Sequence, residues 1–417
     1  MLLRAVVVIL FFFIVMTTKA QHSEIPIIVE KSRDSTYADS KVSSREVDLS
    51  DVWSAAFRKK KHQKENISDT IKKKELLISA LPAIGYSLQT KFAIAGILNG
   101  AFYTSKSRKE NISSVLMNIT YSQNKQILFP VQSNIWTKGN KYNLYTDWRY
   151  LKFPSTTYGL GGNTRLSDGY LMDYSYLRFY QTLLRSIAPN WYAGLGYDLD
   201  YYWNIKEINP PVGVQTDLQK YGLTKRATAS GTTLNLKYDN RKNSINPENG
   251  YFASLTYRSN FTFIGSDASW QSIVLDLRKY NKLPFSSKNI LAFWGYVWLT
   301  PGGGKPTYML LPSTGNDVNN NSGRGYIQGR FRSKNMLYLE SEYRFGITNN
   351  GLVGGVVFVN AQSFSDKTTE KFQTVYLGWG AGLRLKVNKY SRTNIAIDYG
   401  FGEGGSRGFF VNLGELF

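Results

Sequence analysis

The sequence predicts an all-β protein, a transmembrane antiparallel β-barrel. Three observations predict this class: amphipathic alternation along most of the chain, an unusually aromatic composition, and an amino-terminal export signal. In 191–205 every odd position from Trp191 to Ile205 is apolar, whereas the even positions include Asp198 and Asn204. Because strand side chains alternate between two faces, one face suits hydrocarbon and the other tolerates water.

The amino terminus predicts export. Arg4 precedes an apolar run over 5–16, and small residues around Ala20 fit a signal-peptidase site. The run is too short to cross a bilayer as a helix, and no later segment holds about 18 uninterrupted apolar residues. We therefore expect residues 1–20 to be a cleaved signal peptide, and a barrel behind such a signal to lie in the bacterial outer membrane.

Residues 21–76 differ from the rest of the chain, because they are basic and polar and show little apolar periodicity. This composition predicts a mostly flexible periplasmic extension. Its lysines are typical of a solvated tail. The lesser alternative is that they tether the extension by charge to the inner leaflet of the outer membrane. They are Lys59, Lys60, Lys61, Lys64, Lys72, Lys73 and Lys74.

Residues 77–417 carry the strand pattern. About 340 residues, at roughly ten per spanning strand plus turns and loops, accommodate on the order of 16 strands. Even counts between about 14 and 18 stay open, and a soluble multi-sheet protein is the less favoured alternative. The clearest further alternations are 142–150, 232–241, 251–261, 336–345, 379–388 and 394–401.

Composition narrows the partners. Cysteine is absent, which excludes disulfides and thiolate metal sites. The 29 Tyr, 23 Phe and 9 Trp suit the aromatic girdles of a membrane barrel. A formal charge of +21 favours anionic lipid headgroups, lipopolysaccharide or acidic partners, although solvated loops and a basic lumen explain it as simply. Nucleic acid is not an expected partner of an exported barrel.

The histidines argue against an enzyme. The two in the chain are His22 and His62, both ahead of the barrel, so the barrel has no histidine to act as acid or base. We therefore predict no enzymatic activity, no metal and no cofactor. Acidic residues of the predicted lumen are better interpreted as ion-pair partners of arginines. The acids are Asp147, Asp198, Asp200, Glu340 and Glu342, and the arginines are Arg149, Arg258, Arg344 and Arg384.

Residues 301–333, hereafter the long loop, are the most informative connection. A loop of this length without structure of its own is usually functional or disordered. It ends with an Arg-Gly-Tyr sequence at 324–326. In the next strand, 336–345, alternation places Glu340 and Glu342 on the lumenal face. An arginine folded into the lumen would meet both carboxylates, so we expect the loop to fold inward.

From residue 77 to its end the chain resembles the BamA/TamA surface-antigen barrels, the superfamily of outer-membrane assembly and two-partner secretion transporters. Arg324, Gly325 and Tyr326 resemble the family's Arg-Gly-aromatic motif, which folds back into the lumen from the sixth extracellular loop. The segment 339–345 is similar to the strand that receives this arginine, and Glu342 is the better match to the receiving glutamate.

Further segments extend the resemblance in the family's order. Residues 81–86 resemble the family's entry into its first strand, and 239–241, followed by Pro247 and Gly250, a recurrent hairpin with a wide turn. The last six residues resemble the family's carboxy-terminal insertion signal, in which Gly414 is followed three residues later by the aromatic Phe417.

The chain departs from the family pattern in two places. A second lumenal acid of the family falls in a Phe-x-Asp segment after Glu342, where this sequence has Asn360. An amide there still accepts a hydrogen bond from Arg324 but brings no charge, so we expect the loop lock to rest mainly on Glu342. Family members that handle proteins usually carry periplasmic POTRA domains, and residues 21–76 are too few to hold one.

The resemblance implies a seam that opens between the first and last strands. We expect it between the strand near 83–102 and the strand at 409–417, softened by Gly85, Gly96 and Gly100. Barrel curvature explains these glycines as simply.

Two functions stay open. The first is outer-membrane protein insertion or translocation without its own client-binding domain, beside other assembly proteins or client barrels. The second is a channel or membrane scaffold that passes small solutes.

Overall fold

The computed structural model describes the barrel nearly completely and a short segment ahead of it. The predicted signal peptide, 1–20, and most of the predicted extension, 21–76, lie outside the described residues. The described residues are 46–49, 51–52, 55, 76–87, 89–105, 111, 113–222, 224–241, 243–283, 289–317, 320–389 and 392–417.

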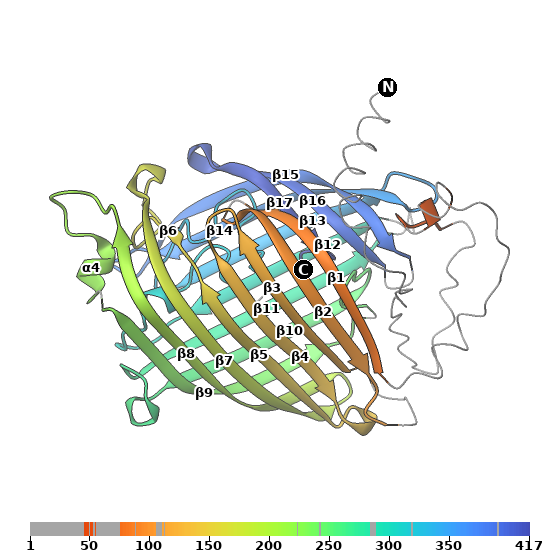
Figure 1. Cartoon of the computed structure of the whole chain (residues 1–417), viewed down its shortest axis with the longest axis horizontal. Helices are drawn as coiled ribbons and strands as arrows, with labels where there is room; N and C mark the ends of the chain where they lie inside the picture. The colour runs from red at the N-terminus through yellow and green to blue at the C-terminus, as the bar shows by residue number, and fades with distance from the viewer. Residues whose placement is uncertain are drawn as a thin grey trace.

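The strands form one antiparallel sheet that curls into a barrel (Figure 1), so the predicted fold class is confirmed. The described residues form 17 strands. The short β6 follows β5 along the same neighbour, β7, so the two fill one of 16 positions in the wall. The strands are β1 (Leu76–Ser87), β2 (Lys91–Phe102), β3 (Ser113–Ser122), β4 (Ile127–Trp136), β5 (Tyr142–Lys152), β6 (Ser155–Thr157), β7 (Tyr170–Ala188), β8 (Trp191–Ile208), β9 (Arg226–Asp239), β10 (Gly250–Asn260), β11 (Trp270–Lys282), β12 (Ile290–Leu299), β13 (Met336–Gly346), β14 (Val353–Ser365), β15 (Phe372–Asn388), β16 (Thr393–Gly402) and β17 (Arg407–Leu413).

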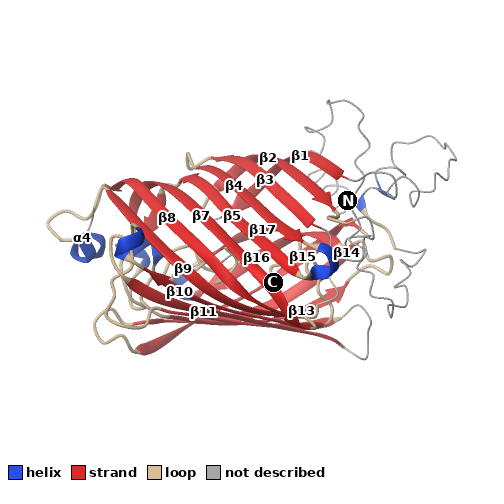
Figure 2. Cartoon of the chain, turned by 90° about the horizontal axis from the view of Figure 1, so that it is seen from below, coloured by secondary structure: helices blue, strands red, loops and turns tan. Residues whose placement is uncertain are grey.

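Helical segments are short and lie in the connections (Figure 2). The α-helix α4 (Asp217–Gly222) lies at one end of the barrel, which also carries the long loop; we call it the loop end and the opposite end the turn end. No helix in the described part of the chain is long and apolar enough to cross a membrane. The single-turn 3-10 helices are η1 (Lys138–Asn140), η2 (Leu166–Asp168), η3 (Thr262–Ile264), η4 (Tyr308–Leu310) and η5 (Glu403–Gly405).

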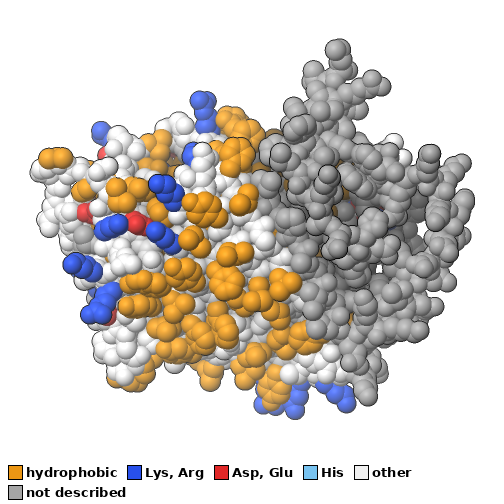
Figure 3. Space-filling view, viewed as in Figure 1, with side chains coloured by type: hydrophobic (Ala, Val, Ile, Leu, Met, Phe, Trp, Pro, Cys, Tyr) orange, Lys and Arg blue, Asp and Glu red, His pale blue; other side chains and the backbone are white. Residues whose placement is uncertain are grey.

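The outer wall is apolar (Figure 3), with hydrophobic side chains gathered over the strands and basic side chains toward the ends. Leu195, Leu339 and Trp379 are 64%, 64% and 56% exposed. Residues of the opposite parity point inward, among them the buried Asp198 of β8 and Glu340 of β13. This division between an apolar outside and a polar inside is the pattern of a barrel whose wall faces lipid.

Strand β8 changes its facing near its end, which corrects part of the predicted alternation. Up to Trp203 the odd positions lie on the outer side, but Ile205 is only 5% exposed and belongs to an inner cluster. Asn204 has a left-handed backbone (φ 55°), and the pairing with β7 shifts register between Asp173 and Ser175. A bulge of this kind inserts one residue and reverses the side-chain parity beyond it.

The predicted first strand, 83–102, is two strands. β1 and β2 form a hairpin around Gln89 and Thr90 and pair from Leu76 opposite Phe102 to Ser87 opposite Lys91. This turn contains no Gly, Pro or Asn, so the sequence pattern did not predict it. The prediction that Gly96 and Gly100 soften the seam was therefore wrong, because both lie on β2.

The seam between β1 and β17 is the weakest junction of the wall. Within the described residues, the register between these strands holds a single partner pair, Ser87 opposite Phe410. By contrast, β17 pairs with β16 along its whole length, from Arg407 to Leu413. Gly85 lies on β1 two residues from this pair. Most of the facing edges of β1 and β17 therefore lack a strand partner.

A short stretch of described residues, 46–49 with 51–52, lies against the turn end. Its acids meet two lysines, one at the end of β15 and one in the connection that follows. Glu46 lies 3.1 Å from the Lys386 Nζ, and Asp51 lies 2.8 Å from the Lys389 Nζ. The described part of this basic extension thus contacts the barrel through its acidic side chains.

Candidate functional site

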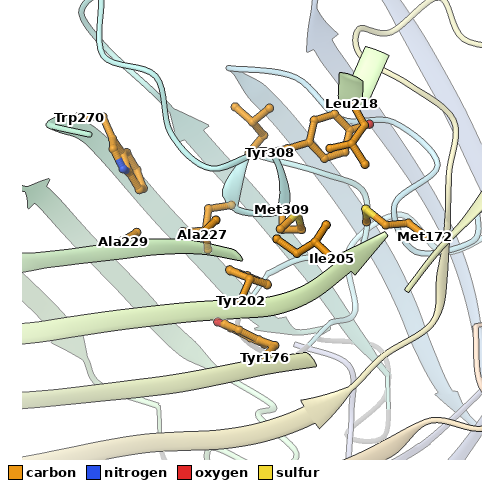
Figure 4. Close-up of a cluster of buried hydrophobic side chains, with 12 residues drawn as sticks. Met172, Tyr176, Tyr202, Ile205, Leu218, Ala227, Ala229, Trp270, Tyr308 and Met309 are labelled. Carbon is orange, nitrogen blue, oxygen red and sulfur yellow. The ribbon is translucent and has the colours of Figure 1, made fainter. Parts of the chain in front are cut away.

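The first half of the long loop is anchored on the wall of β7, β8 and β9. The 3-10 helix η4 sits over the ends of these strands and faces α4 (Figure 4). The Tyr308 hydroxyl lies 2.7 Å from the Thr157 hydroxyl, and Tyr221 donates to the Pro306 carbonyl over 2.9 Å. The apolar cluster around η4 is Met172, Tyr176, Tyr202, Ile205, Leu218, Ala227, Ala229, Trp270, Tyr308, Met309, Leu310 and Leu311.

The second half of the loop crosses to the opposite wall. There Arg324 is fully buried, and its guanidinium donates to Glu340 and Glu342 of β13 and to Asp398 of β16, the last over 2.6 Å. The Phe358 ring lies 3.7 Å from the guanidinium carbon. Burial alone would lower the pKa of Arg324, but the attraction of the three carboxylates outweighs it and raises the pKa well above its ordinary value. The loop is thus tied to two separate strands by one side chain.

Two further arginines balance the charge of the three carboxylates. Arg344 lies 2.6 Å from Glu342, and Arg384 lies 2.5 Å from Asp398. All of these groups are buried. Buried ion pairs add little net stability over apolar packing, but removing one partner leaves an uncompensated charge and costs about 3–5 kcal/mol. The network therefore specifies where the loop sits more than it strengthens the barrel.

Glycines let the loop backbone approach the wall closely. Gly325 has a left-handed backbone (φ +103°), and a Cβ there would lie 2.5 Å from the Phe401 carbonyl oxygen. On the wall, a Cβ on Gly400 would lie 2.7 Å from the Gly325 nitrogen. Both contacts involve backbone, which cannot rotate aside, so larger residues would push the loop away from β16.

Tyr326 also holds the loop against the wall. Its hydroxyl donates to the Leu377 carbonyl over 2.5 Å and accepts from the Glu403 amide over 2.9 Å. Burial raises the pKa of Tyr326 to about 12. The Arg-Gly-Tyr sequence is thus fixed at each residue: by ion pairs, by close backbone contact and by a bridging hydroxyl.

The role predicted for Asn360 was wrong. Instead of accepting from the guanidinium, its Nδ2 donates to the Arg324 main-chain oxygen over 2.9 Å. Asp398 supplies a second acidic strand for the Arg324 guanidinium. The lock therefore does not rest mainly on Glu342. Sequence reasoning missed Asp398, although it stands on the inward parity of the alternating segment 394–401.

The carboxy-terminal residues turn into the lumen. β17 ends at Leu413, and Gly414 (φ +92°) turns the chain away from the wall, so the predicted strand 409–417 ends early. Phe417 is 3% exposed, against 51% for the outward-facing Phe409. The aromatic predicted to act as an insertion signal is therefore packed inside the barrel.

Lumenal acids of the opposite wall also meet arginines. Asp147 lies 2.6 Å from Arg149, and Asp200 lies 2.6 Å from Arg258. Tyr180 donates to both Asp200 oxygens over 2.9 Å. Among the residues that the structure describes, no group of three or more His, Cys, Asp or Glu side chains is arranged to hold a metal ion.

Comparison with known proteins places this geometry in a family. The model of the Omp85 superfamily domain matches residues 117–417. No curated protein matches the chain in sequence. Among solved structures, BamA from Haemophilus ducreyi lacking POTRA domains 1-3 is similar with a TM-score of 0.56 at 14% identity, over 81% of this chain and 70% of that chain.

Two further structures share the fold. CdiB from Escherichia coli matches with a TM-score of 0.55 at 10% identity, over 82% of this chain. CdiB from Acinetobacter baumannii matches with a TM-score of 0.52 at 13% identity, also over 82%. The match spans 62% and 60% of those two chains. An Omp85 barrel implies the bacterial outer membrane. Because the family model covers more than half of it, the chain belongs to the Omp85 superfamily.

Proposed function

We propose that this barrel acts in, or beside, the insertion or translocation of outer-membrane proteins. The observation that carries the proposal is the seam, where the register of β1 and β17 holds only Ser87 opposite Phe410 within the described residues. Unpaired strand edges accept an added strand, because its backbone gains hydrogen bonds while its apolar side chains stay in lipid. The role is non-enzymatic and needs no cofactor.

The filled lumen favours this function over a solute channel. The long loop crosses the interior from the apolar cluster around η4 to the buried Arg324. The carboxy-terminal residues occupy more of the lumen. A small-solute pore needs an open path, whereas a seam that opens toward lipid needs a stable wall elsewhere. The long backbone pairings away from the seam, such as those of β7 with β8 and of β16 with β17, supply that stability.

The proposal includes the placement of the chain. Residues 1–20 direct export and are removed, 21–76 lie in the periplasm, and the loop end faces outward. The apolar wall contacts outer-membrane lipids and lipopolysaccharide, which the basic side chains at the two ends suit. In this proposal other assembly proteins present the clients to the barrel.

A reversible lock of the seam tests the proposal. The native chain has no cysteine, so a Ser87→Cys, Phe410→Cys pair introduces the only possible disulfide. We expect the oxidised variant to lose most of its ability to insert unfolded outer-membrane porins into liposomes, and reduction to restore it. The control is a Val115→Cys, Ser133→Cys pair, at directly paired positions of β3 and β4 away from the seam.

Full insertion activity of the oxidised seam variant would overturn the proposal and favour a channel or scaffold. Co-purification from the native membrane gives an independent check. Trapped client barrels or partners with periplasmic capture domains support the proposal. Recovery of the lone barrel with measurable conductance contradicts it.

A further inference from the structure

The last four residues follow a defined path inside the turn end of the barrel. The Gly414 amide donates to the Asn394 carbonyl over 2.7 Å, and the Glu415 amide donates to the Ile245 carbonyl over 3.2 Å. Ile245 belongs to the β9–β10 connection, on a distant part of the wall. Backbone contacts on two sides thus hold the start of the tail, 414–417, inside the barrel.

Glu415 is held as a bound ligand carboxylate would be. Its Oε2 lies 2.8 Å from the Arg384 Nε and 3.7 Å from the Arg344 Nε, while its Oε1 accepts from the Asn394 Nδ2 over 2.8 Å. The Glu415 side chain is 2% exposed. Charge-assisted contacts from two guanidinium groups make this a specific carboxylate site.

Phe417 fills an aromatic pocket beside that carboxylate site. Its ring stacks on Trp294 of β12 with 5.3 Å between centroids and lies 6.2 Å from the Tyr280 ring of β11. Arg344 lies over the same ring, and its Nη2 donates to the Phe417 main-chain oxygen over 3.1 Å. The pocket therefore contacts both the aromatic side chain of Phe417 and its main-chain oxygen.

The long loop reaches the same tail. The Asn321 Nδ2 donates to the Leu416 carbonyl over 2.8 Å, and its Oδ1 accepts from the Asn412 Nδ2 over 2.9 Å. Asn412 is a residue of β17, the last strand of the seam. Asn321 is three residues from Arg324, so the locked loop also secures the tail.

We propose that the turn end of the lumen carries a binding site for peptide segments of the form acidic–apolar–aromatic, and that residues 414–417 of the chain occupy it as a tethered ligand. While the tail is seated, β17 stops at Leu413 and leaves the facing edge of β1 open. The inference concerns the seam of the proposed function, but it rests on the tail's own contacts.

The tail could instead extend β17 along β1, and a comparison of the two positions shows why it stays in the site. Continuing the register of Ser87 opposite Phe410 would place Leu413 opposite Ile84 and extend the pairing with β1. Along that line Glu415 has the parity of the exposed Phe409 and would face outward. A carboxylate exchanges two arginine partners for the lipid side of the wall, which disfavours the extended strand.

Cross-linking across the seam in the full chain tests the occupancy. A disulfide between Ile84→Cys and Leu413→Cys reports pairing below Phe410 without altering the site. We expect little cross-linking with the native tail. Adding Phe417→Ala should raise the cross-linked fraction about tenfold, since ~1.4 kcal/mol of lost contact shifts an equilibrium by that factor. The matched control, Phe409→Ala, removes an outward aromatic from the same strand.

Peptide binding tests the ligand class. A fluorescent Gly-Glu-Leu-Phe peptide is added to the folded Glu415→Gln, Phe417→Ala variant, in which the site is weakly occupied. We expect saturable binding about tenfold tighter than to the native chain and abolished by Trp294→Ala. Equal binding of a scrambled Leu-Gly-Phe-Glu peptide would overturn the proposal. So would a cross-linked fraction that Phe417→Ala leaves unchanged. Neither measurement depends on insertion activity, so failure here is distinguishable from failure of the proposed function.

Discussion

Arg324 of the long loop and Asp398 of β16 form a direct ion pair, with 2.6 Å between Nη1 and Oδ2 across 74 residues of sequence. β16 is the neighbour of β17, the last strand of the seam. The same guanidinium also meets Glu340 and Glu342 on β13. The loop therefore braces the region beside the seam against a more distant part of the wall.

Removing this guanidinium should release the loop. In Arg324→Ala three buried carboxylates lose a shared partner, which should lower the free energy of unfolding by about 3–5 kcal/mol. We expect the barrel to insert in the membrane while added protease cuts the long loop faster than in the native protein. Arg226→Ala, at an exposed arginine of the loop end, is the control. Unchanged protease resistance and unchanged conductance of Arg324→Ala would count against the lock.

An added acid at position 360 should weaken the loop. The Asn360 amide donates to the Arg324 carbonyl, so Asn360→Asp replaces a donor with a carboxylate that repels that oxygen. Asp398 already gives the Arg324 guanidinium a carboxylate partner beyond those of β13, so a further acid brings no benefit. We expect a loss of about 1–3 kcal/mol, measured by urea unfolding in liposomes. A more stable Asn360→Asp variant would show that the site lacks an acid after all.

Bulk under the loop backbone should dislodge it. A Cβ in Gly400→Ala would stand 2.7 Å from the Gly325 nitrogen, and overpacking of this kind costs about 1–3 kcal/mol. Gly100→Ala is the matched control, because a Cβ there has no neighbour within 4 Å. Proteolysis of the long loop should accelerate in the first variant alone, and equal rates in both would refute the close approach.

Deletion of Phe417 should impair assembly of this protein. The residue resembles an insertion signal, and in the folded barrel it also stacks on Trp294. We expect reduced surface levels together with a less stable barrel, whereas Phe409→Ala should leave both near normal. Surface levels equal to those of the native chain would contradict the signal role.

The sequence predicted the wall well, because the lipid-facing and lumenal faces impose opposite chemistry on alternate residues. It failed where backbone geometry breaks that alternation. Asn204 reverses the parity that had placed Ile205 outside. The β1–β2 turn carries no Gly, Pro or Asn, so the sequence pattern predicts one strand where the structure has two.

The candidate site was predicted only in part for a related reason. The motif at Arg324 and the parity of Glu342 are local features, visible in one stretch of sequence. Asp398 lies on a strand brought into place by the closure of the barrel, and no local signal couples it to the loop. The inward turn at Gly414 depends likewise on distant partners, Trp294 and Arg384.

The central claim is that the wall is weakest where β1 meets β17. Hydrogen–deuterium exchange of the barrel in liposomes measures this directly, because amide protection reports local opening. We predict that amides of β1 and β17 facing the seam exchange at least about tenfold faster than those of the β7–β8 hairpin. Equal protection of the seam and of that hairpin would contradict the claim.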